Sequence, residues 1–323
     1  MDSETTISTV EYAVEARGLA RYYGRVRAVE HLEFAVRPGE IFGLVGPDGA
    51  GKSTTIRMLC GALTPSKGTA IVAGYDVVRQ PERVKEHIGY MSQRFNLYPD
   101  LTFQEKLDFF ADLYRLPRQL KAVRLAEALG FSRLEPFRDR LAGQLSGGMK
   151  QKLALAITFL HRPGVLLLDE PTTGVDPVSR QEFWQILQQL MQEGISILYS
   201  TPYMDEAERC STVAFISNGR IIAMGPPQEF KRNTATLMVE VEATPLRLAR
   251  DLCRTLPFVE DVQTFGQQLH VAIDARMARH EEAASVVEQE LRKRGLEPVT
   301  VRLIAPSLED VFTWFKRRQE RAL

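Results

Sequence analysis

A glycine-rich segment with one lysine and one serine has the residue types needed to hold phosphate. It fits the pattern GxxxxGK[ST] and reads Gly46-Pro47-Asp48-Gly49-Ala50-Gly51-Lys52-Ser53. The glycines let backbone amides turn toward phosphate oxygens without Cβ clashes. Lys52 can bridge the β- and γ-phosphates of a nucleotide, and the Ser53 hydroxyl can bind Mg²⁺. The segment follows an apolar run at 41–45 and opens a helical pattern, which favours a nucleotide site over a simple glycine turn.

A second candidate is a pair of carboxylates after the apolar run 165–168. Asp169 and Glu170 would stand at the carboxyl end of a core strand, where ligands of open α/β sheets bind. Asp169 can hold Mg²⁺ directly or through water, and Glu170 can orient or deprotonate an attacking water. The structural alternative is an acidic pair that only caps the strand.

A second glycine-rich helix start, at residues 145–151, lacks a lysine at the P-loop position. It reads Leu-Ser-Gly-Gly-Met-Lys-Gln. Ser146 is a plausible N-cap, which is the structural interpretation. The functional interpretation is a second phosphate grip, made of the Ser146 hydroxyl, the Gly148 amide and the helix dipole.

These segments, together with Gln93 and in this order along the chain, resemble the nucleotide-binding domain of ABC transporters over about residues 12–230. The resemblance implies an ATPase that uses ATP and Mg²⁺ and drives a separate transmembrane permease, which would contact the surface near residues 93–101. It also implies a head-to-tail pair with a second ATP-binding domain, from the same protein or from a paralogous subunit. The run 306–312 (Pro-Ser-Leu-Glu-Asp-Val-Phe) is similar to the tail of drug-exporter ATPases of the daunorubicin-resistance type. The implied cargo is therefore exported.

The resemblance also assigns individual positions. Tyr23 matches the aromatic residue that stacks on adenine, with Tyr22 as its substitute and a packed strand tyrosine as the alternative. Thr54 extends the phosphate-binding segment, and Gln93 matches the glutamine that contacts Mg²⁺ and water. Two segments would act on the nucleotide of the partner domain, and their residues are Ser146, Gly147, Gly148 and Asp176. Asp176 is also a plausible helix N-cap before Pro177.

Two positions depart from the family pattern. Pro202 stands where members usually carry a histidine, and proline has neither an imidazole nor an amide N–H to offer the γ-phosphate. Losing one such donor typically costs on the order of 10² to 10³ in rate, so hydrolysis at this P-loop is expected to be impaired while binding is not. Asp48 replaces an asparagine, which keeps an acceptor and loses two donors.

The elements that position these residues alternate between buried strands and helices, which predicts an α/β fold with a parallel sheet. The resemblance makes it a P-loop NTPase (RecA-like) core with an antiparallel β subdomain and a helical subdomain at about 94–150, within an ATP-binding domain at 12–230. Thr102 and Glu105 predict a capping box at the start of a helix whose buried face holds Leu107, Phe110, Ala111 and Tyr114. Residues 217–220 predict a hairpin turn, residues 277–294 a helix, and residues 1–11 a flexible N-terminus. After about residue 230, the order β-α-β-β-α-β predicts a small ferredoxin-like α+β domain over 236–323.

Composition limits the remaining function classes. The 323 residues suit two domains, and 41 basic residues balance 41 acidic ones, which argues against nucleic acid as a partner. Three scattered cysteines show no metal-ligand spacing. The acidic N-terminus and the lack of a long apolar run predict a cytoplasmic protein, peripheral at the cytoplasmic face of the membrane.

Two other functions stay open. The first is a soluble ABC ATPase without a transport role, which usually needs fused ATPase domains, coiled-coil insertions or basic linkers. The second is a mainly regulatory ATP-binding subunit paired with a competent ATPase domain. In that case Phe312, Trp314 and Phe315 of the tail could dock on a partner, although such a pattern is more often a packed helix.

Overall fold

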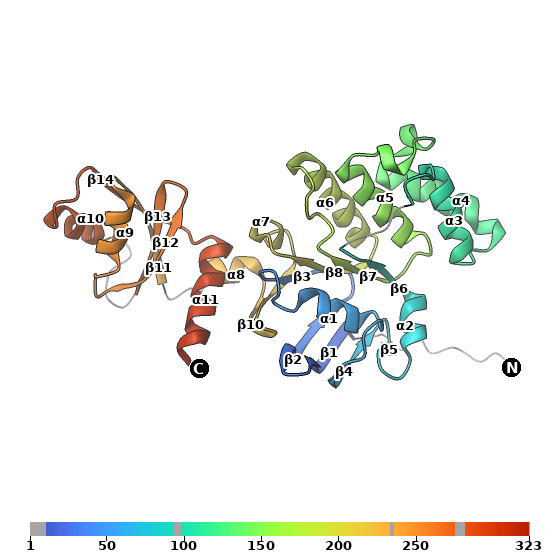
Figure 1. Ribbon diagram of the computed structural model, residues 1–323, viewed down its shortest axis with the longest axis horizontal. Coiled ribbons are helices and arrows are strands. Elements are labelled where there is room, and N and C mark those ends of the chain that lie inside the picture. Colours follow the sequence, from blue (N-terminus) through green and yellow to red (C-terminus); the bar gives the residue numbers. More distant parts are fainter. Residues whose placement is uncertain (1–10, 94–97, 233–235, 275–281, 323) are drawn as a thin grey trace. The chain divides into compact units, whose positions relative to one another are not determined.

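The computed structural model describes residues 11–93, 98–232, 236–274 and 282–322, and divides into two compact units, Met1–Met224 and Gly225–Leu323 (Figure 1). The division precedes the 230–236 interval suggested by the sequence. Helix α8 (Pro227–Arg232) belongs to the second unit, where the rings of Phe230 and Phe315 lie 5.7 Å apart. The expected flexible segment 1–11 lies outside the described residues, except for Glu11.

A six-stranded sheet forms the centre of the first unit, in the order β10-β9-β3-β8-β7-β6. Its strands are β3 (Ile41–Val45), β6 (Ile88–Met91), β7 (Val165–Asp169), β8 (Ser196–Thr201), β9 (Thr212–Ser217) and β10 (Arg220–Gly225). The pairs from β6 to β9 are parallel. Every residue of β3 and β7 is buried, which explains their continuous apolar sequences. Parallel strands end at one edge, so the loops after β3, β7 and β8 meet there.

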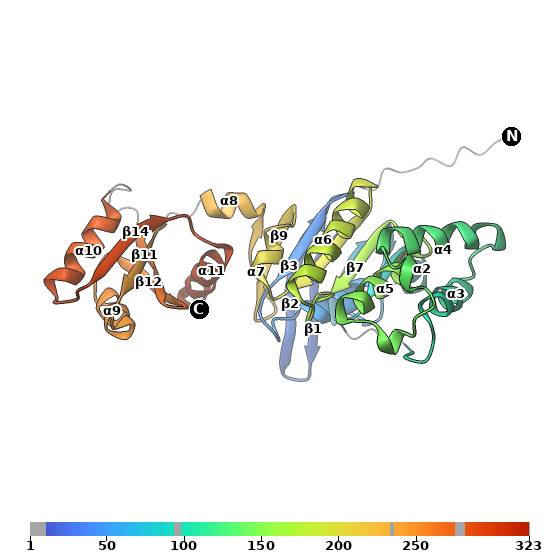
Figure 2. The same ribbon diagram turned by 90° about the horizontal axis from the view of Figure 1, so that it is seen from above.

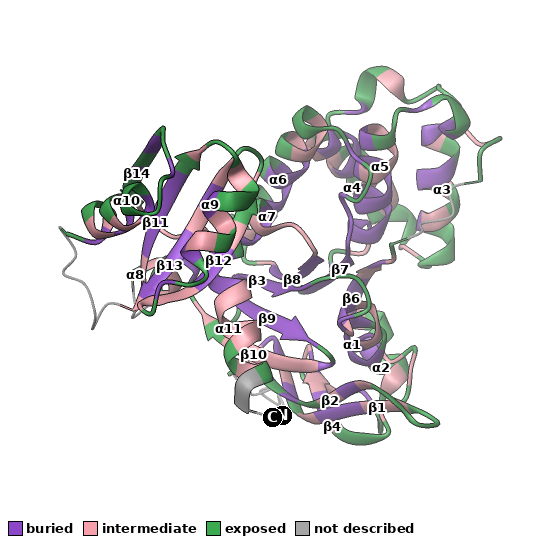
Figure 3. Cartoon of the chain, turned by 60° about the vertical axis from the view of Figure 1, so that its left-hand side comes forward, coloured by how far each residue is buried: buried purple, intermediate pink, exposed green. Residues whose placement is uncertain are grey.

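An antiparallel sheet packs below the central one, in the order β2-β1-β4-β5. Its strands are β1 (Val14–Tyr23), β2 (Val26–Val36), β4 (Lys67–Val72) and β5 (Tyr75–Asp76). Helix α1 (Lys52–Leu59) contacts strands of both sheets and lies between them (Figure 1). Buried side chains of the two sheets and of α1 form one hydrophobic core (Figure 3). The predicted α/β core with an antiparallel subdomain is confirmed.

The other longer helices described in the first unit are α2 (Pro81–His87), α3 (Phe103–Leu113), α4 (Arg118–Ser132), α5 (Gly147–Phe159) and α6 (Pro177–Gln192). Helix α6 packs on β8 and α5 (Figure 2). The capping box of Thr102 and Glu105 is present at the start of α3. Leu107 and Ala111 are buried as expected. Tyr114 is 38% exposed, because it is the C-cap residue at which α3 ends, although its ring lies beside that of His161.

The second unit has the predicted β-α-β-β-α-β order, followed by a last helix. Its elements are β11 (Thr236–Ala243), α9 (Leu246–Cys253), β12 (Val259–Phe265), β13 (Gln268–Asp274), α10 (Ala283–Lys293), β14 (Val299–Ile304) and α11 (Leu308–Ala322). The antiparallel sheet has the order β12-β13-β11-β14 and packs its own core against α9 and α10. Part of the expected helix 277–294 lies outside the described residues.

Within the ranges described above, none of the helices combines the length and the apolar character needed to cross a membrane.

Candidate nucleotide-binding site

In the loop between β3 and α1, two of the three glycines, Gly46 and Gly51, lie where there is no room for a side chain. A Cβ on Gly46 would lie 2.2 Å from the carbonyl oxygen of Ile216, and a Cβ on Gly51 would lie 2.7 Å from that of Ala28. Gly51 also has a φ of +108°, which other residues rarely adopt. These contacts press the loop against β2 and β9, so that its free side is the one left for a ligand.

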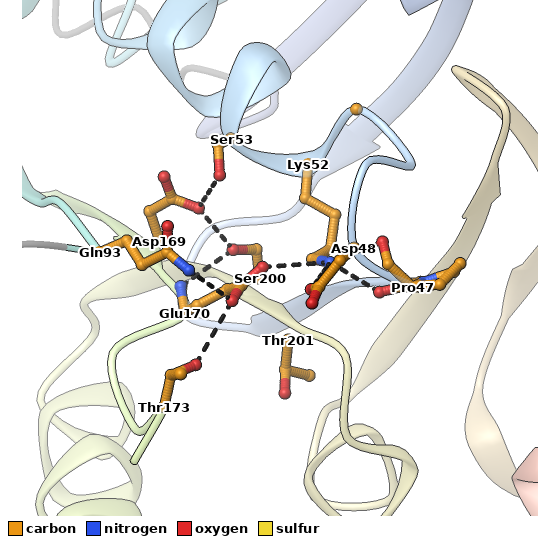
Figure 4. Close-up of polar contacts among 12 residues, drawn as sticks. Pro47, Asp48, Lys52, Ser53, Gln93, Asp169, Glu170, Thr173, Ser200 and Thr201 are labelled. Carbon is orange, nitrogen blue, oxygen red and sulfur yellow. Dashed lines mark hydrogen bonds and ion pairs between the residues drawn. The ribbon is translucent and has the colours of Figure 1, made fainter. Parts of the chain in front are cut away.

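Lys52 directs its ammonium group into this loop (Figure 4). Its Nζ donates to the carbonyl oxygens of Gly46 and Pro47 at 2.7 and 2.9 Å, and lies 3.1 Å from Oε1 of Glu170. The Lys52 side chain is 2% exposed, whereas that of Asp48, 3.9 Å from the same nitrogen, is 91% exposed. The buried cation is therefore balanced mainly by Glu170, and Asp48 faces solvent.

Asp169 lies fully buried at the end of β7, among hydroxyl groups from two other segments. Its Oδ1 accepts hydrogen bonds from Ser53 at 2.9 Å and Ser200 at 3.0 Å. Burial raises the pKa of the Asp169 carboxyl above its ordinary value, and the two hydrogen bonds oppose that shift. Its Oδ2 is buried and has no hydrogen-bond partner among the described residues.

That unpartnered oxygen is a test of whether the site fits a divalent cation. A carboxylate oxygen without a donor, next to a serine hydroxyl, is the kind of oxygen donor set that Mg²⁺ takes beside a phosphate. Asp169 and Ser53 therefore fit the ion that the sequence suggested.

Glu170 has an unusual backbone and several side-chain partners. Its φ of +49° lies in the left-handed region, which is uncommon for residues other than glycine. Its backbone N–H donates to Ser200 Oγ at 3.0 Å. Its Oε2 accepts from Gln93 Nε2 at 3.0 Å and from Thr173 Oγ1 at 3.3 Å. The structure thus brings Gln93, Glu170 and Lys52 to one point, as Figure 4 shows.

A pocket of about 130 Å³ opens over these groups, lined by Ala28, Gly49, Gly51, Lys52, Ser53, Thr54 and Glu170. Ala28 and Ser200 were not identified from the sequence. Ala28 contributes only backbone position, which no residue type signals. Ser200 could have been suspected, because a hydroxyl stands there on a strand that runs parallel to β7.

The two tyrosines proposed for adenine lie near the end of β1. Tyr23 is 46% exposed, and the Arg21 guanidinium lies 4.7 Å from its ring centroid. Tyr23 is not among the residues that line the pocket over Lys52, and Tyr22 lines a different hollow. The adenine contact stays a prediction.

The second glycine-rich segment lies beside the loop that contains Asp176. Ser146 caps α5 by accepting from the Met149 N–H at 3.3 Å, and Asp176 caps α6 by accepting from the Ser179 N–H at 2.9 Å. A Cβ on Gly148 would come within 2.3 Å of Ser179, so the two helix starts are in close contact. No residue of either segment lines the pocket over Lys52.

Pro202 follows β8 next to the phosphate loop. The carbonyl oxygen of Thr201 accepts a hydrogen bond from the Gly46 N–H at 3.2 Å. Residue 202 therefore directly follows the residue that is hydrogen-bonded to the start of that loop, and its proline has no hydrogen-bond donor to offer the loop.

A glycine-rich loop with an ammonium group can bind phosphate, a serine beside an aspartate can bind Mg²⁺, and a glutamate beside a glutamine can position water. On a parallel sheet, with an antiparallel subdomain and a helical region, these groups define a P-loop ATP-binding cassette.

Comparison with known proteins agrees with this class. A family model described as ABC transporter matches residues 29–173. The chain is 34% identical over 302 residues to the daunorubicin resistance ATP-binding protein DrrA2 of Streptomyces coeruleorubidus, covering 93% of this chain and 94% of that protein. It is 39% identical over 258 residues to the Nod factor export ATP-binding protein I of Ralstonia nicotianae, covering 79% and 80%. The chain belongs to the ABC transporter family.

Some other matches cover a smaller share of this chain. The probable multidrug ABC transporter ATP-binding protein YbhF of Escherichia coli is 42% identical over 228 residues, but the match covers 70% of this chain and only 39% of YbhF. Among solved structures, an ATP-binding subunit of an ABC transporter is 32% identical with a TM-score of 0.61, covering 68% of this chain and 92% of that one. The cbiO1 structure from Clostridium perfringens, part of an ABC transporter complex, is 27% identical with a TM-score of 0.63, covering 76% and 96%.

Proposed function

We propose that this chain is the ATP-binding subunit of an ABC exporter and couples ATP binding and hydrolysis to efflux by a separate permease. The observation that carries the proposal is the Lys52 ammonium, which is buried in a loop of carbonyls and paired with Glu170. A triphosphate entering the pocket would take over that cation and free Glu170 to act on water.

Each predicted residue has a place in this proposal. The segment 46–54 binds the phosphates, and Ser53, Asp169 and Gln93 hold Mg²⁺, which would neutralise phosphate charge when bound. Glu170 is the general base, Gln93 orients the water, and Tyr23 stacks on adenine.

Isothermal titration calorimetry with Mg-ATP tests the binding step. Lys52→Ala should remove measurable binding, because the phosphates lose their central cation. Lys293→Ala, which changes an exposed lysine of the second unit, should bind like the wild type. If Lys52→Ala still binds Mg-ATP with wild-type affinity, or if the wild type gives no heat, the proposed function is wrong.

A second ATP-binding domain completes the site. Ser146, Gly147, Gly148 and Asp176 do not line the pocket over Lys52, yet they form one surface with a helix N-terminus and small residues that suit a phosphate. A partner domain, identical or paralogous, would place this surface over ATP. The wild type should therefore associate in Mg-ATP, and Lys52→Ala should not; a tight ATP-dependent dimer of that variant would contradict the pairing.

A hollow in the first unit suits a cytoplasmic helix of the permease. It has a volume of about 290 Å³ and lies between α2 and the end of α3, with Leu113 60% and Tyr114 38% exposed at its rim. Charged residues of both signs surround these side chains. Its lining is Glu82, Lys85, Glu86, Leu113, Tyr114, Arg115 and His161. It is close in sequence to the surface at 93–101 expected to contact the permease, of which residues 94–97 lie outside the described ranges.

The proposed docking is tested by copurification with the native membrane partner. Leu113→Glu should lose the permease while keeping Mg-ATP affinity, since a charge replaces an apolar contact. Leu248→Glu changes a leucine of the second unit that is 48% exposed; it is the matched control and should keep both. Retention of the permease by Leu113→Glu would place the contact elsewhere. The names of the relatives, which mention multidrug transport and daunorubicin resistance, support drug-like cargo. The proposed pairing with a permease would place the chain at the cytoplasmic face of the membrane.

Pro202 favours a second form of the same function. The site has Lys52, Asp169 and Glu170 but lacks a donor at residue 202. In this form the chain holds ATP mainly to join the two domains, while a partner domain with a complete site does most of the turnover.

A further inference from the structure

A buried carboxylate outside the phosphate pocket accepts hydrogen bonds from hydroxyl groups of the loop after β7 and of strand β8. Glu206 lies on the short helix α7 (Met204–Ala207) and has no exposed surface. Its Oε1 accepts from Thr172 Oγ1 at 2.6 Å. Its Oε2 accepts from the Tyr199 hydroxyl at 3.0 Å and from Thr201 Oγ1 at 2.5 Å. All three donors are neutral side chains.

The donors belong to the segments that form the phosphate site. Thr172 is two residues after Glu170, in the same loop. Thr201 ends β8, and its carbonyl oxygen accepts from the Gly46 N–H of the phosphate loop. Glu206 therefore links the loop that contains Glu170 to the strand end beside Gly46.

The backbone of Glu170 needs such support. Its φ of +49° is a strained conformation for this residue, and such residues keep their geometry only when the surroundings hold them. On one side, Ser200 Oγ accepts from the Glu170 N–H. On the other side, Thr172, two residues after Glu170, donates a hydrogen bond to Glu206. The N–H of the next residue, Thr173, donates to the Glu170 carbonyl oxygen at 3.2 Å.

The position of the Glu206 carboxylate depends on its three hydroxyl donors, because the neighbouring cation is too far away for a hydrogen bond. Arg180 of α6 is the nearest cation, with Nε 3.8 Å from Oε1, outside hydrogen-bond distance. Burial raises the pKa of Tyr199 well above its ordinary value, so Tyr199 stays a neutral donor. A buried carboxylate with neutral donors is costly to maintain, and an apolar cluster would pack this region as well.

We infer that Glu206 is a positioning residue: through Thr172 it holds Glu170 at the angle needed to act on water. This inference rests on the proposed function and adds a residue that does not contact the nucleotide. The hydroxyl of Thr172 carries the effect, so removing it should reduce turnover more than it reduces nucleotide binding.

The matched pair Thr172→Val and Thr172→Ser tests this in the full chain, because valine keeps the shape of threonine and serine keeps its hydroxyl. Thr172→Val and Glu206→Gln should lower the single-turnover hydrolysis rate by about ten- to a hundredfold and leave the Kd for Mg-ATP unchanged. Thr172→Ser should behave like the wild type. Thr158→Val, which removes a buried hydroxyl bonded within α5, is the control for loss of stability.

Amide hydrogen exchange gives a readout that does not depend on turnover. Thr173 and Val175 donate to backbone oxygens within the 170–175 loop, and both should exchange faster in Thr172→Val than in Thr172→Ser. Equal exchange in the two variants would overturn the inference, as would equal rates, or a rate loss matched by an equal loss of Mg-ATP affinity. A wild type that binds no Mg-ATP would instead refute the proposed function, and this shows before any variant is compared.

Discussion

At the scale of single residues, Pro202 is the feature that most affects the expected chemistry. It directly follows Thr201, which is hydrogen-bonded to Gly46 of the phosphate loop, and it supplies no hydrogen-bond donor. Pro202→His should raise the hydrolysis rate by on the order of 10² to 10³, the usual value of one preorganised donor in a transition state. Measuring phosphate release by the purified chain in both forms checks this.

Pro202→Ala separates the two groups that proline lacks. Alanine restores the backbone N–H without an imidazole, so a rate close to that of the wild type is expected if the imidazole is what matters. A wild type that already hydrolyses ATP as fast as Pro202→His would show that the site compensates for the proline.

Asp169 ties the site to stability and pH. Its pKa is raised in the folded protein, so folding favours its protonated form. The stability associated with this group is fully present below the unfolded pKa and is lost as pH rises through the folded pKa. Asp169→Asn should therefore raise Tm at pH 7, and the gain should shrink toward about pH 4.

Differential scanning calorimetry without nucleotide measures this effect at both pH values. Asp176→Asn is the control, because Asp176 is an exposed helix cap and asparagine caps about equally well. A Tm gain for Asp169→Asn that does not depend on pH would show that burial of the charge is not its cause.

At the scale of elements, the contact between the starts of α5 and α6 leaves less room for a side chain at one glycine of the segment 145–151 than at the other. A Cβ on Gly148 would lie 2.3 Å from Ser179, whereas a Cβ on Gly147 has its nearest neighbour at 3.8 Å. Gly148→Ala should lower the free energy of unfolding by about 1–3 kcal/mol, since the helices must move apart. Gly147→Ala is the matched control and should cost little. Urea denaturation of both variants decides the matter, and equal losses would mean that α5 and α6 are not in this close contact.

The elements that the sequence predicts well are those with local signals. The strand 41–45, the capping box at Thr102 and the hairpin turn at Asn218 and Gly219, both with positive φ, each depend on a few neighbouring residues. Tyr114 was assigned wrongly to a buried face because helical periodicity does not reveal where α3 ends. The Glu206 cluster had no local signal, since Thr172 and Glu206 are 34 positions apart and meet only through the order of the sheet.

At the scale of the whole molecule, the motifs indicate which groups meet in one chain and which need another. Strand order places Lys52, Asp169 and Glu170 at one edge of the sheet, in agreement with the prediction from the ends of the apolar runs 41–45 and 165–168. The left-handed backbone of Glu170 and its contact with Lys52 could not be predicted, because both result from tertiary packing between segments far apart in the sequence. The second glycine-rich segment (residues 145–151) and Asp176 lie outside the pocket over Lys52, which agrees with the proposed role on a partner's nucleotide.

Each of the two units has buried hydrophobic side chains of its own, which predicts two separable unfolding events. Leu167 is fully buried in the first unit and Leu291 in the second. Leu167→Ala and Leu291→Ala should each destabilise their own unit by about 2–5 kcal/mol, so each should lower a different calorimetric transition. A ligand stabilises only the unit that binds it. Mg-ATP should therefore raise the transition that Leu167→Ala lowers, leave the other in place, and bind Leu291→Ala with wild-type affinity. One transition that both variants lower, and that Mg-ATP raises as a whole, would show that the units unfold together and that the second core supports the nucleotide site.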